Sequence, residues 1–132
     1  MTEFEGRPTH RVRVRYCETD RMAVAHHGSY VAWFEEARTE WMRARGTTYR
    51  EIEDAGFLLQ IVDFACSYHK PVDYDDVVEI RVRIAESSKV WVTLAYECRR
   101  EHDGAVCATG HTKLACVSPQ GKVQRLPAEL RA

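Results

Sequence analysis

The feature that most restricts the fold of this chain is a row of large side chains at helical spacing. From residue 30 to residue 44, apolar residues recur every three or four positions, which places them on one stripe covering about a third of a helix. The members of this stripe are Tyr30, Trp33, Phe34, Ala37, Trp41 and Ala44. Aromatic side chains of this size need cover from other elements, so the rest of the chain is expected to wrap around one long helix.

Capping residues mark the ends of this helix and predict a second, shorter one. Ser29 follows a glycine and is predicted as the N-cap, and Gly46 stands where a left-handed residue commonly ends a helix. Thr48 and Glu51 have the spacing of a capping box, so residues 49–55 are predicted as the second helix. The long helix is therefore followed closely by a short one.

Alternating apolar and polar residues predict strands before and after the helices. Residues 10–16 alternate strictly, so Val12, Val14 and Tyr16 are expected on the buried face of a first strand. Four further strands are predicted at residues 57–68, 77–85, 90–98 and 105–117. The first of these four is apolar along its length and is expected to be buried. An antiparallel sheet that packs one face on the helix stripe gives a two-layer α+β domain.

Composition narrows the classes of partner and the compartment. At 132 residues the chain is most simply one domain, residues 1–132, and its formal net charge of −1 favours neither nucleic acid nor a membrane as partner. The five cysteines are odd in number and include no C-x-x-C pair, which indicates free thiols in a reducing compartment. Because the first residues lack the apolar core of a signal peptide, a cytoplasmic location is expected.

One segment before and within the long helix resembles a known family. Residues 15–40 read RYCETDRMAVAHHGSYVAWFEEARTE, and Tyr68, Pro71 and Asp76 extend the match. With the order strand, long helix, four strands, this segment closely resembles the hotdog-fold thioesterases of the 4-hydroxybenzoyl-CoA thioesterase and YbgC-like acyl-CoA thioesterase family. The resemblance implies a hotdog fold, in which a five-stranded antiparallel sheet wraps around one long helix. It also implies a homodimer or homotetramer with active sites at the subunit interface, an acyl-CoA substrate and no cofactor.

The same resemblance assigns roles to individual residues. It makes Asp20 the nucleophile or the general base for water, and it gives the backbone N–H of His27 the task of polarising the thioester carbonyl. In the YbgC-like branch a tyrosine and a histidine join the aspartate, and these match Tyr16 and His27. Lys89 falls where a lysine contacts the nucleotide of coenzyme A. The family commonly has glycine three residues after the aspartate, where this chain has Ala23, so the loop is expected to be tighter or differently angled.

Read from the residues alone, each candidate has a structural alternative. An acid just before a helix N-terminus can do chemistry beside free N–H groups, but spacing alone favours a turn-capping role for Asp20. Tyr16 can be a core tyrosine, the side chain of His27 can simply pack, and Lys89 can be a solvated turn residue. The adjacent histidines His26 and His27 lack a third ligand at a suitable spacing, so no metal is expected.

Other nucleophiles and acids in the sequence have weaker support. Cys17 could act with a histidine, although an inert thiol is the commoner state. Glu36 is expected on the solvated face of the helix, and Glu40 borders the apolar stripe and remains a minor catalytic candidate. Arginines on the predicted strands alternate with glutamates on the same outward faces, so a mixed-sign surface is expected rather than a site for polyanions.

These observations predict an acyl-CoA thioesterase, a hydrolase that releases coenzyme A and a carboxylic acid. A hotdog dehydratase acting on hydroxyacyl thioesters and a non-catalytic acyl-CoA binding module are the alternatives. The sequence leaves open the acyl chain, the choice between nucleophile and general base for Asp20, and the packing of a tetramer.

Overall fold

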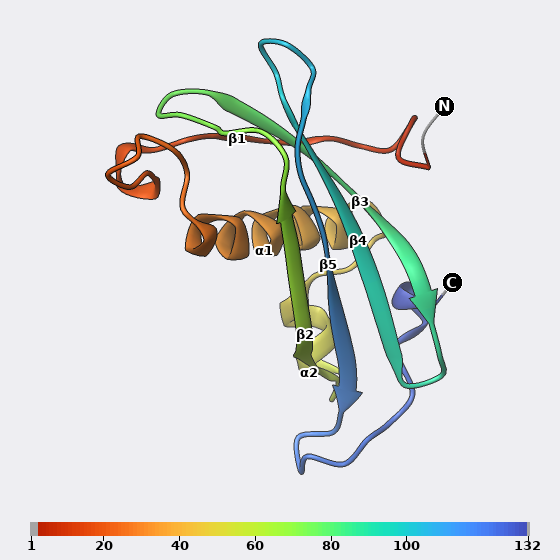
Figure 1. Cartoon of the computed structure of the whole chain (residues 1–132). Coiled ribbons are helices and arrows are strands. Elements are labelled where there is room, and N and C mark those ends of the chain that lie inside the picture. The colour runs from red at the N-terminus through yellow and green to blue at the C-terminus, as the bar shows by residue number, and fades with distance from the viewer. Residues whose placement is uncertain (1–2, 132) are drawn as a thin grey trace.

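The structure is a computed structural model that describes residues 3–131. A long helix, α1 (His27–Ala44), lies across one face of a curved five-stranded antiparallel sheet (Figure 1). The strands are β1 (His10–Arg13), β2 (Leu58–Tyr68), β3 (Val77–Ser87), β4 (Trp91–Arg100) and β5 (Val106–Val117). Their order in the sheet is β1-β3-β4-β5-β2. The predicted two-layer α+β arrangement is confirmed.

The sheet is built around three strands that follow one another in the chain. Strands β3, β4 and β5 pair as consecutive antiparallel neighbours, while β1 pairs with β3 and β2 pairs with β5. Both edge strands therefore come from earlier in the chain than the centre of the sheet. As the alternating pattern predicts, Val78, Ile80 and Val82 of β3 are buried against the helix side.

The aromatic stripe of α1 forms the centre of the core. Trp33 and Phe34 are fully buried, and the Phe34 ring stacks on Tyr96 of β4 with ring centroids 4.2 Å apart. Gly110 of β5 lies directly under this helix face, because a Cβ there would overlap the Ala65 carbonyl oxygen and come within 2.7 Å of Phe34 Cε2. The absence of a side chain at Gly110 lets the helix approach the sheet closely.

The apolar stripe ends differently from the sequence prediction. Trp41 is only half-buried and Ala44 is exposed, whereas Arg38 and Met42 are buried. The buried line therefore follows the spacing of four from Phe34 through Arg38 to Met42. The prediction of an inward Ala44 is wrong because the last turn of α1 buries Met42 instead, which packs with Ile52 of the second helix and with Leu130 and leaves Ala44 exposed.

Helix α1 begins three residues earlier than predicted. His26, not Ser29, is the N-cap residue, and Ser29 lies inside the first turn. The Ser29 hydroxyl donates to the backbone carbonyl of Glu18 at 2.9 Å rather than accepting from a helix N–H. The prediction missed this because a loop carbonyl competes for the hydroxyl. At the other end Gly46 has φ 90°, as expected for a left-handed residue after a helix.

Strand β1 is shorter than predicted. Val12 and Val14 are buried as expected, but the strand ends at Arg13 and residues 16–18 form a short 3-10 helix. Tyr16 is therefore 79% exposed, and its ring meets Tyr74 edge to face. The expectation of a buried Tyr16 is wrong because the chain turns before the alternation reaches it, and Glu18 points inward instead.

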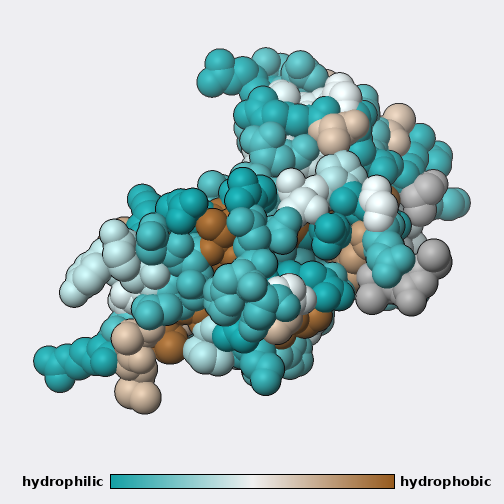
Figure 2. All heavy atoms as spheres, turned by 90° about the horizontal axis from the view of Figure 1, so that it is seen from above, coloured by the Kyte–Doolittle hydropathy of each residue, from teal (hydrophilic) through white to brown (hydrophobic). Residues whose placement is uncertain are grey.

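Strand β2 is an edge strand and not the buried strand predicted. Ile61, Val62 and Tyr68 are each about half exposed in the chain, at 47%, 55% and 52%. An apolar strand sequence is compatible with burial, but whether the strand is buried depends on which other residues pack against it. A view from above shows a largely hydrophilic surface in which hydrophobic residues form small separate patches (Figure 2).

The second helix and the C-terminal segment close the lower end of the domain in Figure 1. Helix α2 (Tyr49–Asp54) is capped by the Thr48 side chain, which accepts from the Glu51 N–H at 3.1 Å, as predicted. Leu126 and Leu130 are fully buried, and Leu130 packs with Met42 and Ile52 in a second apolar cluster. Within residues 3–131, none of the helices is long and apolar enough to cross a membrane.

Candidate active site

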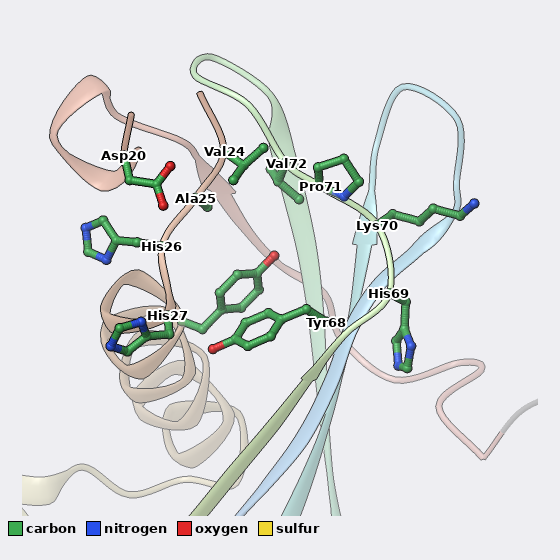
Figure 3. A pocket seen from close by; sticks show the side chains of 11 residues that line it. Asp20, Val24, Ala25, His26, His27, Tyr68, His69, Lys70, Pro71 and Val72 are labelled. Atoms are coloured by element: carbon green, nitrogen blue, oxygen red, sulfur yellow. The ribbon is translucent and has the colours of Figure 1, made fainter. Parts of the chain in front are cut away.

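A pocket of about 420 Å³ opens between the loop before α1, the first turn of α1 and the segment that follows β2 (Figure 3). Its lining residues are Asp20, Val24, Ala25, His26, His27, Tyr30, Tyr68, His69, Lys70, Pro71 and Val72. Figure 3 shows the Asp20 carboxylate on the loop above the start of α1, where His26 and His27 lie. Of the residues expected at the site, the pocket brings together Asp20 and His27, which the sequence places seven residues apart.

The loop that carries Asp20 is a tight turn closed by its own backbone. The Ala23 N–H donates to the Asp20 carbonyl at 2.9 Å, and the Asp20 N–H donates to the Val24 carbonyl at 3.0 Å. Oδ1 of Asp20 accepts the Met22 N–H at 2.8 Å. Within residues 3–131, no donor contacts the other carboxylate oxygen. Asp20 thus holds the turn with one oxygen and presents the second to the pocket.

Ala23 adopts a backbone conformation that usually belongs to glycine. Its φ is 60°, in the left-handed region, where an L-residue bears a strain of about 1–2 kcal/mol. This explains in physical terms why a glycine suits this position in the family that the sequence resembles. The alanine keeps the left-handed turn and bears the strain.

The first turn of α1 presents a hydrogen-bond donor to the pocket. The His26 N–H donates to the Glu18 carbonyl at 3.1 Å, and the Ser29 N–H donates to the His26 carbonyl at 3.0 Å. Among the described residues no acceptor takes the backbone N–H of His27, and the positive end of the helix dipole lies here. The His27 side chain is exposed and faces the His26 ring edge to face. The free backbone N–H of His27 can therefore polarise an oxygen bound in the pocket.

Two tyrosines form an aromatic wall of the pocket. The Tyr30 and Tyr68 rings meet edge to face with centroids 5.3 Å apart. Tyr30 comes from the buried stripe of α1 and is 2% exposed, while Tyr68 ends the edge strand β2. Burial raises the pKa of the Tyr30 hydroxyl, so it stays protonated at neutral pH. This wall can contact an apolar or aromatic group next to Asp20.

Glu18 lies just behind the pocket and was missed by the sequence reasoning. Its carboxylate accepts the Trp33 indole N–H at 2.7 Å and the Arg15 backbone N–H at 2.8 Å. Burial alone would raise the pKa of Glu18, but these hydrogen bonds and the Arg15 guanidinium outweigh it and hold the pKa below its usual value. The signal in the sequence is slight, since it consists only of an acid three residues after Arg15.

Arg38 is a second buried polar residue that the sequence reasoning missed, and it lies away from the pocket. Its guanidinium donates to the Tyr49 hydroxyl at 2.5 Å and to the Tyr96 hydroxyl at 3.2 Å. The Tyr96 hydroxyl also bonds Thr112 at 2.7 Å. The spacing of four from Phe34 was the available signal, because it places Arg38 at the border of the buried stripe.

The other expected site residues lie outside the pocket. Tyr16 is exposed and does not line the pocket, and Lys89 is exposed in the connection between β3 and β4. Cys17 and Glu40 are exposed as well. Lys70, which the sequence reasoning did not consider, lines the pocket, and its side chain extends away from Asp20 (Figure 3). Across residues 3–131, no three His, Cys, Asp or Glu side chains are grouped to hold a metal ion.

Comparisons with known proteins agree on the family. The sequence model described as the Thioesterase-like superfamily matches residues 14–132. A protein of Aquifex aeolicus, provisionally named an esterase, is 37% identical over 121 residues, 92% of each chain. The acyl-CoA thioesterase YbgC of Haemophilus influenzae is 28% identical over 124 residues, covering 92% of this chain and 89% of its own.

A solved structure is similar over most of the chain as well. The DHNA-CoA thioesterase from Staphylococcus aureus superposes with a TM-score of 0.85 at 31% identity, over 89% of this chain and 79% of its own. The predicted hotdog fold is confirmed by this likeness. The match over residues 14–132, together with these relatives, shows that the chain belongs to the Thioesterase-like superfamily.

Proposed function

We propose that this chain is an acyl-CoA thioesterase, which hydrolyses a thioester to free coenzyme A and a carboxylic acid. The observation that carries the proposal is the Asp20 carboxylate, which faces the N-terminal turn of α1 across one pocket. The acyl-CoA thioesterase and DHNA-CoA thioesterase named among its relatives support the same class of substrate.

The proposed mechanism uses few groups. The thioester carbonyl oxygen accepts from the His27 backbone N–H, which stabilises the oxyanion as it forms; one such donor is typically worth about 10²–10³ in rate. The second carboxylate oxygen of Asp20 either attacks the carbonyl carbon to give a mixed anhydride or takes a proton from the attacking water. In either route the C–S bond breaks and the thiolate leaves. Because a thiolate is a good leaving group, no strong general acid is needed.

The side chains of His27 and Tyr16 have a subordinate place in this proposal. The His27 ring lies at the pocket and can contact the substrate. The Tyr16 hydroxyl lies outside the pocket of its own chain, so a catalytic part for Tyr16 requires a second copy to bring it near the thioester. Both roles remain predictions.

We also propose that the protein forms a homodimer, two of which can associate as a homotetramer. Strand β2 is a long edge strand with exposed apolar residues, a kind of surface that soluble proteins usually cover. Pairing of β2 with a second copy would cover Ile61 and Val62 and would bring the partner close to Tyr68 at the pocket. Light scattering coupled to size-exclusion chromatography measures this directly, and a monomer at micromolar concentration would contradict it.

Lys70 is proposed to bind a phosphate of coenzyme A. Its side chain leads away from Asp20 (Figure 3), as is needed for a nucleotide held at a distance from the thioester. Lys70→Ala should raise KM for an acyl-CoA but leave KM for the matching N-acetylcysteamine thioester, which lacks the nucleotide, unchanged. Lys89→Ala is the comparison variant for KM. Lys89 lies outside the pocket of its own chain, so it can contact the nucleotide only if it comes from a partner subunit.

The test of the function is a panel of acyl-CoA substrates with a thiol reporter. Asp20→Asn keeps a side-chain oxygen for the Met22 N–H, so the turn should persist while kcat falls by about 10²–10⁴. Wild-type activity equal to that of Asp20→Asn and Asp20→Ala across the panel would exclude the proposal. Hydration of an enoyl thioester without thiol release would indicate the dehydratase, and saturable binding without turnover would indicate the binding module.

A single turnover in ¹⁸O-labelled water tests the nucleophilic role of Asp20. If Asp20 attacks the thioester and water then attacks the Asp20 carboxyl carbon of the anhydride, the label enters Asp20 and the product acid is unlabelled. If Asp20 activates water, or if water attacks the acyl carbon of the anhydride, the label appears in the product acid, so only label in Asp20 identifies the nucleophile.

A further inference from the structure

We infer that Glu18 is a positioning residue, which fixes the Asp20 loop against α1 through a buried clamp to Trp33, Arg15 and the first turn of the helix. The inference rests on the proposed function, because it concerns the alignment of Asp20 with the His27 N–H.

The first half of the clamp is the side chain of Glu18. The carboxylate is 9% exposed, and each of its oxygens accepts from a different element. Oε2 accepts the Trp33 indole N–H at 2.7 Å, and Oε1 accepts the Arg15 backbone N–H at 2.8 Å. Trp33 is fully buried in the close-packed core, so the carboxylate joins the segment that follows β1 to a fixed point on α1.

The second half of the clamp is the backbone of the same residue. The Glu18 carbonyl accepts the Ser29 hydroxyl at 2.9 Å and the His26 N–H at 3.1 Å. Thr19 and Ala25 then pair as an antiparallel bridge, so residues 19–25 form a closed loop whose base is Glu18 and His26. Asp20 is two residues from this base on one side, and His27 is one residue from it on the other.

The clamp therefore sets the separation between the two groups that meet the substrate. A misplacement of about 1 Å in a catalytic group can cost about 10²-fold in rate. Substitution of a residue that only stabilised the fold would lower the free energy of unfolding and leave kcat of the folded protein intact. A positioning role and a purely stabilising role of Glu18 therefore predict different effects of its substitution on loop order and on kcat, and both quantities can be measured.

Two variants loosen the clamp from opposite sides. Glu18→Gln removes the charge and one acceptor, since the amide keeps a single carbonyl oxygen for two donors. Trp33→Phe removes the indole donor and leaves Glu18 in place, which keeps the inference testable if Glu18→Gln does not fold. Tyr49→Phe is the matched control, because it removes one partner of the buried Arg38 on the same helix without contacting the loop.

Hydrogen–deuterium exchange of the free protein is the first readout. The amides of Asp20 and Ala23 close the loop by hydrogen bonds, so they should exchange faster in Glu18→Gln and Trp33→Phe than in wild type. They should exchange at the wild-type rate in Tyr49→Phe. Because no substrate is present, this result does not depend on the proposed function.

Steady-state kinetics on the acyl-CoA that wild type hydrolyses fastest is the second readout. Both loop variants should lose about 10- to 100-fold in kcat with little change in KM, and Tyr49→Phe should keep the wild-type kcat. Unchanged loop exchange, or faster exchange with an unchanged kcat, would overturn the positioning role. If wild type shows no thioesterase activity on the whole panel, the proposed function fails, while the exchange data still decide whether Glu18 holds the loop.

Discussion

The first turn of α1 and the remainder of the helix are held in different ways. The first turn is tied by hydrogen bonds to a solvent-facing loop through Glu18, and the pocket opens beside it. The remainder packs against the sheet, with Phe34 stacked on Tyr96 and Arg38 bonded to the buried Tyr96 hydroxyl. Residues in one part of α1 therefore mainly stabilise the fold, while residues around its first turn mainly position the groups at the pocket. Apart from Trp33, which bonds Glu18, changes in the packed part should lower the free energy of unfolding and leave kcat of the folded protein unchanged. Changes in the loop part should alter catalysis more than stability.

The largest effect is expected at the closest approach of helix and sheet. Gly110→Ala would place a methyl group against the Ala65 carbonyl and the Phe34 ring, neither of which can move easily. We expect the free energy of unfolding to fall by about 3 kcal/mol, measured by urea denaturation, with kcat per folded molecule unchanged. A loss below about 1 kcal/mol would mean that the helix is less tightly seated than its burial indicates.

A smaller loss of stability is expected at the buried arginine. Arg38→Met keeps most of the side-chain volume but leaves the Tyr49 hydroxyl and one bonding position of Tyr96 without a donor. The free energy of unfolding should fall by about 2 kcal/mol, again without a change in kcat. A lower kcat in fully folded Arg38→Met would break the separation between the two parts of the helix.

The loop part should respond to pH through Glu18. The folded-state pKa of Glu18 lies below its usual value of 4.5, so its charged hydrogen bonds stabilise the protein above that pH. At pH 7 wild type should exceed Glu18→Gln by about 1.5 kcal/mol in free energy of unfolding. This difference should shrink as the pH falls through the folded pKa, because the folded carboxylate then binds a proton. Urea titrations between pH 7 and pH 3 measure it, and a constant difference would contradict the assignment.

The smallest effect, and the only stabilising one, is expected at Ala23. Ala23→Gly removes the backbone strain of a left-handed alanine, which is about 1–2 kcal/mol. The greater conformational entropy of the unfolded glycine variant offsets about 0.4–1 kcal/mol of this gain. A net gain of about 0.5 kcal/mol is expected from urea denaturation. Gly121→Ala is the reverse control, since Gly121 has φ 81° in a turn away from the pocket, and it should lose stability.

Much of the fold could be predicted because the spacing of apolar residues along the sequence indicates which face of a helix or strand is buried. The stripe through Trp33 and Phe34 and the inward face of β3 follow directly from helical and strand spacing. The errors fall where burial depends on distant residues. Tyr16 continues an alternating pattern but lies past the end of β1, and β2 is apolar although nothing among residues 3–131 covers its outer residues.

The site could be predicted only in part. The family resemblance selected Asp20 and His27, and the pocket brings them together, while their catalytic roles stay predictions. Lys89 was chosen by its position in the family, yet Lys70 is the lysine that lines the pocket of this chain. Glu18 was passed over because its importance comes from Trp33, a partner fifteen residues away that no local pattern connects to it.

The strand order also sets the sequence of events during synthesis. Strands β1 and β2 and the aromatic helix leave the ribosome before β3, β4 and β5, on which all three of them depend for pairing or cover. The nascent chain must therefore carry an unshielded aromatic helix and an apolar strand until the central hairpins emerge. Pairings between distant segments form slowly, and such intermediates are prone to aggregate. With the order β1-β3-β4-β5-β2, the newly made chain is therefore expected to expose apolar segments until the central strands have formed.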